Sequence, residues 1–328
     1  MDFIKPHIRP RRLRQNASIR RLVQENHINK SDIVYPMFII DGENKTTDIK
    51  SMPHIKRYSI DLAVKEIKSL FTKGILGFAL FPHNPDDVKD ETGSDSINPN
   101  NIINRAIREI KKQVPDCVIF ADVALDPYTT HGHDGIINEK GEVLNDETVK
   151  VLMGQALELA KSGADVISPS DMMDGRIGNI RNHLDNNGFE NTTIMSYAVK
   201  YSSNFYGPFR DAVGSNSALK GDKKTYQMNS ANAVEGLLEA ELDITEGADI
   251  LMVKPGMPYL DIVSQTAQNF NCPVAVYQVS GEYSMIQNMI DNGHMNEEAI
   301  IESMLCFKRA GANLIFTYFA PKIIDLID

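Results

Sequence analysis

One short phrase occurs three times along the chain and restricts the folds that it can adopt. Each time, a stretch with helical periodicity ends at Gly-Ala-Asp or Gly-Ala-Asn, and an apolar run of strand length follows immediately. The three copies lie at residues 163–165, 247–249 and 311–313. Glycine readily adopts the left-handed conformation that ends many helices. Repeated passage from a helix straight into a buried strand indicates parallel strands joined by helical crossovers.

The same alternation of strands and helices runs through the rest of the chain. Eight apolar runs have the length and composition of strands that helices cover on both faces. They lie at residues 33–40, 74–81, 117–125, 165–170, 192–200, 249–254, 273–280 and 314–319. Helices are predicted between them at 61–73 (beginning at an Asp cap), 98–113, 146–162, 230–246, 258–270 and 296–310. Eight strands in a β-α repeat over roughly 295 residues predict an α/β fold, a (β/α)8 TIM barrel.

The alternative to a barrel is a doubly wound open sheet, which commonly carries G-x-G-x-x-G after its first strand. No such motif follows residues 33–40. In a barrel, the connections at the carboxyl ends of the strands carry the functional residues. The connection at 201–229 is long for this position, so we expect it to be an active-site lid within a catalytic barrel at 33–328.

Residues 1–32 differ in charge from the rest and are expected to form an extended N-terminal arm. They hold eight Lys or Arg and three acidic residues, a net charge of +5, whereas the whole chain carries −10. The remainder therefore carries −15, which favours an arm that packs on an acidic neighbouring subunit. A nucleic-acid arm and a transit peptide are the alternatives. Asp2 and Pro6 fit a transit peptide poorly, and the acidic body argues against a nucleic-acid-binding protein.

The three cysteines, Cys117, Cys272 and Cys306, stand far apart without C-x-x-C spacing. This excludes a disulfide scaffold and a cysteine-rich zinc module, and it suits a reducing compartment. No apolar run approaches the roughly 18 residues that a membrane span needs, and no secretory signal is recognisable. We expect a cytoplasmic protein that binds neither membrane nor nucleic acid.

Two lysines, Lys200 and Lys254, stand at the ends of consecutive predicted strands. Pro255 holds Lys254 in an extended conformation. Adjacent strands lie about 4.8 Å apart, so two ammonium groups at one level repel by on the order of 3 kcal/mol, or roughly two pKa units. A lysine whose pKa falls in this way is partly neutral near pH 7 and can attack a ketone to form a Schiff base. The alternative is that carboxylates neutralise both lysines or that their side chains extend to solvent.

Polar residues near the other strand ends extend this hypothesis. Arg210 and Lys223 in the long connection can hold a carboxylate-bearing substrate, or they belong to a solvated basic loop. His131 and His133, near Asp126, carry only a weak metal signal, and we expect them to order the mouth of the site.

Several long phrases resemble one known family, porphobilinogen synthase (5-aminolevulinate dehydratase), nearly end to end. They are 195–201 (MSYAVKY), 204–212 (NFYGPFRDA), 252–259 (MVKPGMPY), 277–283 (YQVSGEY) and 9–14 (RPRRLR). The resemblance implies a lyase that condenses two 5-aminolevulinate molecules to porphobilinogen with loss of water, in tetrapyrrole (haem) biosynthesis.

The resemblance also implies roles for individual residues. Lys254 is expected to hold the substrate that supplies the propionate side, and Lys200 the one that supplies the acetate side. The positions that bind the acetate-side substrate match Arg210, Lys223 and Gln227. Those that hold the propionate-side carboxylate match Ser280 and Tyr318. The family further implies homo-octamers built from arm-linked dimers.

The metal requirement follows from a departure from the family pattern. Zinc-dependent members carry three cysteines after the third strand, where this chain has Ala124, Asp126 and Asp134. Zinc thiolate sites need cysteine, whereas carboxylates suit Mg²⁺. The chain resembles the zinc-independent branch, so no active-site zinc is expected, and Asp126 and Asp134 are expected to order substrate or water, or to bind a cation weakly. Glu239 matches the position that holds an allosteric, hydrated Mg²⁺ in many bacterial members; a solvated acidic helix face is the alternative.

Two other functions remain open from the residues alone. The first is a class I aldolase on the same barrel, in which Lys200 only tunes the reactivity of Lys254. The second is a non-catalytic barrel that binds a carboxylate and uses its basic arm for partners.

Overall fold

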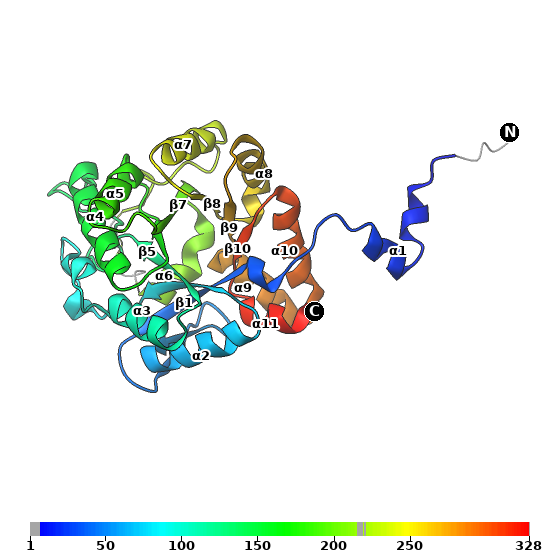
Figure 1. Ribbon diagram of the computed structural model, residues 1–328, viewed down its shortest axis with the longest axis horizontal. Coiled ribbons are helices and arrows are strands. Elements are labelled where there is room, and N and C mark those ends of the chain that lie inside the picture. The colour runs from blue at the N-terminus through cyan, green and yellow to red at the C-terminus, as the bar shows by residue number, and fades with distance from the viewer. Residues whose placement is uncertain (1–6, 215–218, 220, 328) are drawn as a thin grey trace.

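Eight parallel strands close into a barrel in the computed structural model, which describes residues 7–214, 219 and 221–327 (Figure 1). The strand order is β10-β9-β8-β7-β6-β5-β4-β1, and the pairing of Ile33 with Ile315 and of Val34 with Phe316 closes the barrel. The strands are β1 (Ile33–Ile40), β4 (Gly77–Pro82), β5 (Val118–Val123), β6 (Val166–Pro169), β7 (Thr193–Lys200), β8 (Ile250–Lys254), β9 (Val274–Tyr277) and β10 (Leu314–Phe316). The predicted TIM barrel and its eight strands are confirmed.

Helices surround the barrel and cover its outer face (Figure 1). They are α2 (Ile60–Thr72), α3 (Ile102–Gln113), α4 (Asn145–Lys161), α5 (Arg176–Asp185), α6 (Gly207–Val213), α7 (Val234–Thr245), α8 (Leu260–Asn269), α9 (Ser280–Asp291), α10 (Glu298–Ala310) and α11 (Ala320–Leu326). Single 3-10 turns add η1 (Pro10–Arg14), η2 (Lys30–Asp32), η3 (Asp86–Val88), η4 (Ser94–Ile97), η5 (Asn204–Tyr206) and η6 (Met257–Tyr259). The six predicted helices are present, whereas α5, α6, α9 and α11 were not predicted.

The structure corrects one detail of the expected pattern and adds detail in two other places. The helix α2 has Ser59 rather than Asp61 at its N-cap, and Asp61 lies in its first turn. A short hairpin, β2 (Thr46–Asp48) and β3 (Lys56–Ser59), extends the sheet beside the end of β1. The predicted lid contains η5 and α6, and its residues 215–218 and 220 lie outside the described residues.

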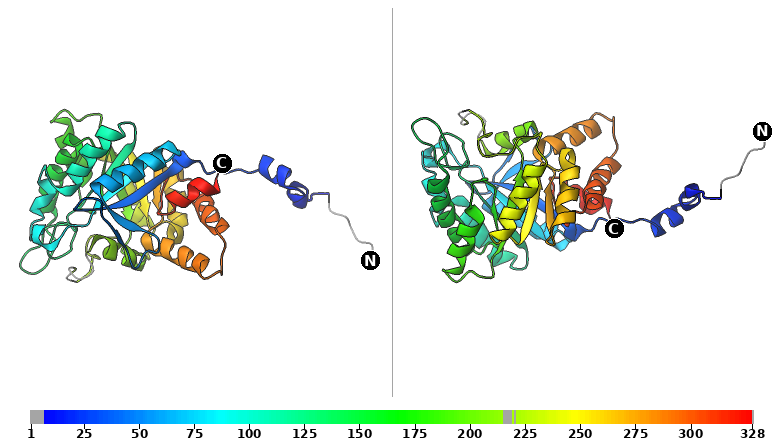
Figure 2. Two further views of the ribbon diagram at one scale, coloured as in Figure 1. Left: turned by 90° about the horizontal axis from the view of Figure 1, so that it is seen from below. Right: turned by 90° about the horizontal axis from the view of Figure 1, so that it is seen from above.

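The N-terminal arm leaves the barrel and points outward, as both further views also show (Figure 2). It carries η1 and the short helix α1 (Ala17–Leu22), while residues 1–6 lie outside the described part of the chain. Four of its large apolar side chains are exposed: Ile8, Leu13, Leu22 and Val23. Of the described helices, none combines the length and the apolar character that crossing a bilayer requires. All three cysteines are free thiols.

The recurring Gly-Ala-Asp/Asn phrase builds the amino end of the barrel. Its glycines end their helices in the left-handed region, at φ +101°, +107° and +108°. The Asp or Asn side chain two residues after each glycine accepts a backbone N–H group of the preceding strand. Asp165, Asp249 and Asn313 accept the backbone N–H groups of Ile119, Ile194 and Val274 at 2.8, 2.8 and 2.9 Å. Each of the three also donates its own backbone N–H to the carbonyl of the same residue. Each side chain therefore locks one strand start to the preceding strand.

We predict that Asp249→Ala lowers the free energy of unfolding by about 1–2 kcal/mol, because it leaves the Ile194 N–H without its acceptor. Asp249→Asn keeps an acceptor oxygen and is expected to stay close to the parent. Urea unfolding followed by circular dichroism measures both changes. An equal loss in the two variants would show that the charge, not the acceptor, stabilises the strand.

Candidate active site

A register shift in β7 aligns the two lysines that the sequence singled out. Met195 pairs with Ile250 and Ser196 with Leu251, but the register then shifts, so that Val199 pairs with Val253 and Lys200 with Lys254. Without the shift, Val199 would stand opposite Lys254. Neighbours at one level of a parallel sheet point to the same face, and a slip by one residue reverses that face. The shift therefore directs both amines into one cavity at the carboxyl end of the barrel.

The side chain of Lys254 lies among aromatic rings and is almost completely buried. Its Nζ lies 4.5 Å from the ring centre of Tyr277, 5.0 Å from that of Tyr197, 5.1 Å from that of Phe209 and 5.5 Å from that of Tyr206. Burial lowers the pKa of Lys254 to about 7, and the charge of the neighbouring Lys200 acts in the same direction. A large fraction of Lys254 is therefore neutral at physiological pH.

Lys200 has a polar environment instead. Its Nζ lies 3.7 Å from a carboxylate oxygen of Asp134 and donates a hydrogen bond to the backbone carbonyl of Ser170. Neutralisation by a carboxylate, which was the alternative for both lysines, thus applies to Lys200. Within the described residues, Lys254 forms no such ion pair.

Asp134 belongs to a charged cluster that also contains Asp126, Lys223 and Gln227. The Lys223 ammonium lies 2.8 Å from Asp134 and 3.4 Å from Asp126, and the Gln227 amide donates to Asp134 at 3.5 Å. Burial raises the pKa of Asp134, but the charges of Lys200 and Lys223 outweigh it and leave the pKa below its usual value. Burial, against the effect of Lys223, raises the pKa of Asp126. The cluster therefore places two carboxyl groups of different acidity beside Lys200.

Asp122 on β5 is a candidate functional residue that the sequence analysis missed. It lines the same cavity, and one of its carboxylate oxygens, although buried, has no hydrogen-bond partner within the described structure. Burial and the nearby Asp126 raise its pKa to about 7, against the effect of both lysines. The signal was present in the sequence, because Asp122 is the one acidic residue in the apolar run 118–123.

The other predicted substrate-binding residues fall into two groups. Arg210 on α6 lines the cavity together with Lys223 and Gln227. Ser280 and Tyr318 are buried behind the aromatic rings and are not among the residues described as lining it. The Ser280 hydroxyl accepts the backbone N–H of Phe209 at 2.8 Å, and the Tyr318 hydroxyl lies 2.9 Å from that of Tyr277. Ser280 therefore contacts the backbone, and Tyr318 the side chain, of a residue whose ring lies near Lys254.

Helix α6 is held in place by a segment far away in the sequence. The Arg57 guanidinium on β3 donates to the backbone carbonyls of Asp211 and Ala212 at 2.6 and 2.7 Å. The Ser51 hydroxyl donates to the Asp211 carboxylate at 2.6 Å. These contacts cap the carboxyl end of the helix that carries Phe209 and Arg210, and no local sequence signal indicated them.

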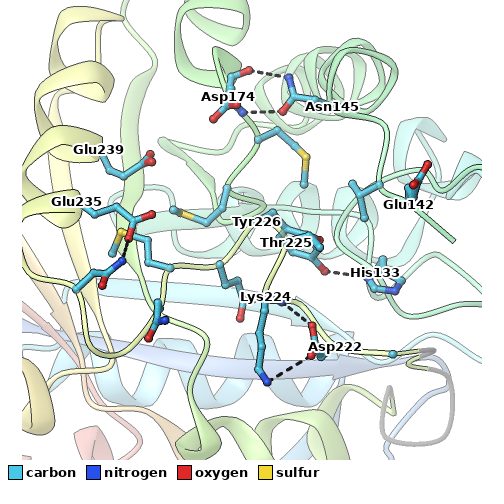
Figure 3. Close-up of a pocket in the computed structure, with 18 of the residues that line it drawn as sticks. His133, Glu142, Asn145, Asp174, Asp222, Lys224, Thr225, Tyr226, Glu235 and Glu239 are labelled. Carbon is cyan, nitrogen blue, oxygen red and sulfur yellow. Dashed lines mark hydrogen bonds and ion pairs between the residues drawn. The ribbon is translucent and has the colours of Figure 1, made fainter.

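Glu239 does not lie in this cavity but in a second, larger one of about 810 Å³. Its carboxylate and that of Glu235 extend from α7 into the hollow (Figure 3). Burial raises the pKa of Glu239 to about 6, Arg176 opposes this, and the carboxylates of Asp243 and Asp174 raise it further. Across the described residues, no group of three His, Cys, Asp or Glu is placed to hold a metal ion.

Tyr226, from the predicted lid, lines the larger cavity and contacts Asp134, which lines the smaller one. Its hydroxyl accepts the backbone N–H of Asp134 at 3.3 Å and lies 3.2 Å from the His133 ring (Figure 3). The His131 ring contacts the carbonyl of Glu91 at 3.1 Å. Both histidines thus contact the loops around the mouth of the site.

Nearly the whole chain matches one family model. The model is described as delta-aminolevulinic acid dehydratase and matches residues 7–326. The chain belongs to the delta-aminolevulinic acid dehydratase family. The family to which the sequence phrases pointed is therefore confirmed.

Individual members of the delta-aminolevulinic acid dehydratase family are similar over most of their length. The protein of Bradyrhizobium diazoefficiens is 53% identical over 316 residues, which cover 96% of this chain and 89% of the relative. That of Chlamydia pneumoniae is 51% identical over 320 residues, covering 97% and 96%. The crystal structure of the Toxoplasma gondii enzyme in complex with its reaction product porphobilinogen superposes with a TM-score of 0.97. It is 44% identical in sequence and covers 99% of this chain and 93% of that one.

We predict that Schiff-base formation at Lys254 accelerates as the pH rises through about 7, because only the amine that has lost its proton attacks a ketone. Lys200→Met removes a like charge and is expected to raise the midpoint. The measurement is the rate of borohydride-trapped adduct at Lys254 with 4-oxopentanoate, as a function of pH.

Lys322→Met is the matched control, because Lys322 pairs with Glu297 at 3.3 Å, remote from the cavity. It is expected to leave the midpoint unchanged. A midpoint near the ordinary lysine value of about 10.4 would contradict the assignment of Lys254 as the neutral amine.

Proposed function

We propose that this chain condenses two molecules of 5-aminolevulinate to porphobilinogen through Schiff bases on Lys254 and Lys200. The observation that carries the proposal is that two buried lysines pair across adjacent strands. One of them lies among aromatic rings and the other beside a carboxylate. Two amines in different environments suit a reaction that must bind two copies of one substrate in different orientations. The family and its porphobilinogen-bound member support the choice of substrate.

The first step takes place at Lys254. The neutral amine attacks the substrate ketone, a C–N bond forms, and the ketone oxygen leaves as water once it has been protonated. The pKa of about 7 allows this attack at neutral pH. Asp122 has a free carboxylate oxygen in the same cavity, and its raised pKa suits a group that exchanges a proton there.

The second substrate binds at Lys200. Its carboxylate would interact with Arg210, Lys223 and Gln227, which line the cavity on that side. Lys223 is bound to Asp126 and Asp134 before substrate arrives. A substrate carboxylate must therefore compete with these two carboxylates for the Lys223 ammonium.

Bond formation follows from the chemistry of the two iminium groups. Each iminium withdraws electrons from the adjacent carbon and makes its proton easier to remove. The carbon nucleophile of the Lys200-bound substrate attacks the iminium carbon on Lys254, and the resulting bond to Lys254 breaks by elimination as the new adjacent carbon loses a proton. The amine of the Lys254-bound substrate then attacks the other iminium carbon and displaces Lys200, which closes the ring, and loss of a further proton gives the aromatic product. Asp122, Asp126, Asp134 and Ser170 are the groups near enough to the lysines to take and return protons.

We propose that catalysis does not use an active-site zinc. The three positions of the zinc thiolates hold Ala124, Asp126 and Asp134, and the Lys223 ammonium lies between the two carboxylates. A second cation at this place would be repelled by that ammonium.

We propose that Glu239 holds a hydrated Mg²⁺ that regulates activity from outside the active site. A partly buried carboxylate whose pKa is raised by burial and by further carboxylates lies in negative potential, which suits a divalent cation. When bound, the ion would supply charge neutralisation only. The cavity of Glu239 also contains the lid residues Lys224 and Tyr226, through which binding can affect the active site.

The proposal includes a homo-octameric, cytoplasmic enzyme. The arm presents exposed Leu13, Leu22 and Val23 away from its own barrel, which supports packing on another subunit. The free cysteines support a reducing compartment.

We predict that Lys254→Met abolishes porphobilinogen formation and leaves the barrel folded, because methionine fills the aromatic site without an amine. Incubation with 5-aminolevulinate, reduction by borohydride and peptide mass mapping are expected to label Lys254 first and Lys200 as well in the parent. Label at Lys254 alone, with no porphobilinogen formed, would favour the single-lysine aldolase. Tight binding of 5-aminolevulinate without an adduct that borohydride can reduce would indicate a non-catalytic barrel.

We predict that Glu239→Gln removes most of the stimulation of turnover by Mg²⁺, while the rate after chelation stays that of the parent. Glu241→Gln is the matched control, since Glu241 is exposed on the same helix and does not line the cavity. Initial rates over a Mg²⁺ titration measure both. An unchanged Mg²⁺ response in Glu239→Gln would refute the site.

A further inference from the structure

Glu282 is a completely buried carboxylate that no step above uses. It lies in the first turn of α9, and three backbone N–H groups point at it. Val279 and Gly256 donate to one oxygen at 2.7 and 3.2 Å, and Met257 donates to the other. Among the described residues, no lysine, arginine or histidine forms an ion pair with it.

A buried carboxylate of this kind is more than a helix cap needs. The bond from Val279 caps α9, and one such bond is what a capping side chain commonly provides. The other two bonds reach a different segment, which follows β8. Burial raises the pKa of Glu282 to about 7 although the three N–H groups lower it, so keeping the charge inside costs stability. Helix capping therefore does not explain the two bonds to the second segment.

On one side, Glu282 fixes the chain directly after Lys254. Gly256 and Met257 are the second and third residues beyond that lysine. A Cβ at Gly256 would lie 2.6 Å from the Phe307 ring, so the backbone packs flat against this ring while its N–H points to Glu282. The carbonyl of Lys254 itself accepts the N–H of Tyr201 at 3.0 Å. The main chain is therefore held both at Lys254 and just after it.

On the other side, Glu282 fixes the start of α9, where Ser280 lies. The donor Val279 immediately precedes Ser280, and the Ser280 hydroxyl accepts the N–H of Phe209 at 2.8 Å. One carboxylate thus connects the segment of Lys254 to the segment of Ser280.

Resting on the proposed role of Lys254 and on the role of Ser280 in holding the propionate-side carboxylate that the family resemblance implies, we propose that Glu282 is a positioning residue that sets the separation between the ketone site and the carboxylate site of the first substrate. A fixed separation selects keto acids by length. 5-Aminolevulinate has two methylene groups between its ketone and its carboxylate, so a 4-oxo acid fits and a 5-oxo acid does not.

The test compares two keto acids that differ by one methylene group, 4-oxopentanoate and 5-oxohexanoate. Their rates of borohydride-trapped adduct formation at Lys254 are measured by peptide mass mapping on the full chain. Glu282→Asp withdraws the carboxylate, and Glu282→Gln turns an amide NH₂ toward backbone donors. In both variants the preference for 4-oxopentanoate is expected to fall on the order of tenfold, with a lower kcat for 5-aminolevulinate.

The ratio of the two rates separates positioning from mere structural damage. A smaller folded fraction lowers both rates equally and leaves the ratio unchanged. Asp249→Asn is the matched control. The Asp249 carboxylate also accepts a backbone N–H, but at the opposite end of the barrel, so this variant is expected to keep the parental ratio of the two rates.

A double-mutant cycle with Ser280→Ala adds a second measurement. Once the Ser280 hydroxyl is absent, adding Glu282→Asp is expected to cause no further change in the ratio of the two adduct rates. Folded Glu282 variants with the parental ratio overturn the inference and leave the proposed function intact. If neither Glu282→Asp nor Glu282→Gln folds, the single variant Ser280→Ala decides, and a parental ratio of the two rates in it overturns the inference. No adduct at Lys254 in the parent refutes the proposed function itself.

Discussion

The active site depends on a shift of one residue in the pairing of β7 with β8. Only this shift brings Lys200 level with Lys254 and turns both side chains inward. All the electrostatic consequences follow from it. Two like charges then share one cavity, and burial together with the charge of Lys200 lowers the pKa of Lys254 to about 7.

The two lysines lie in contrasting environments, which suits the different tasks proposed for them. Lys254 lies among four aromatic rings, whereas Lys200 lies beside Asp134 and donates to a backbone carbonyl. Similar groups whose surroundings push their protonation states apart are a recurring arrangement in active sites. In the proposed reaction, the lowered pKa of Lys254 makes it the amine that accepts the first ketone.

Much of the fold followed from the sequence because buried parallel strands are continuous apolar runs. The same logic failed where a structural element has no local signature. Helix α9 begins at Ser280, where the expected strand still continued, and its cap comes from Glu282 inside the helix instead of from a polar N-cap side chain. The anchoring of α6 by Arg57 joins residues about 150 positions apart, and nothing near either of them indicates it.

The candidate active site, like the fold, was predicted only in part from the sequence. Sequence reasoning found both lysines because they end apolar strands, and the family phrases supplied most of the other positions. The register shift that aligns the lysines has no sequence signal, because bulges arise from how two strands fit together. Asp122 was overlooked although an acid within a buried run is a recognisable anomaly. Ser280 and Tyr318 were expected to hold the propionate-side carboxylate, and this stays a prediction. In the structure their hydroxyl groups contact the Phe209 backbone and the Tyr277 hydroxyl, two residues that lie next to Lys254.

The three Gly-Ala-Asp/Asn phrases lie at the opposite end of the barrel from the lysines, and this has a consequence for evolution. Of the described residues that line the cavity, none is a side chain that locks a strand start, so selection can act on the two ends separately. Substitutions that change the reaction then need no compensating changes in the residues that hold the barrel together. A lineage can thus change the side chains around its substrate while inheriting the same scaffold.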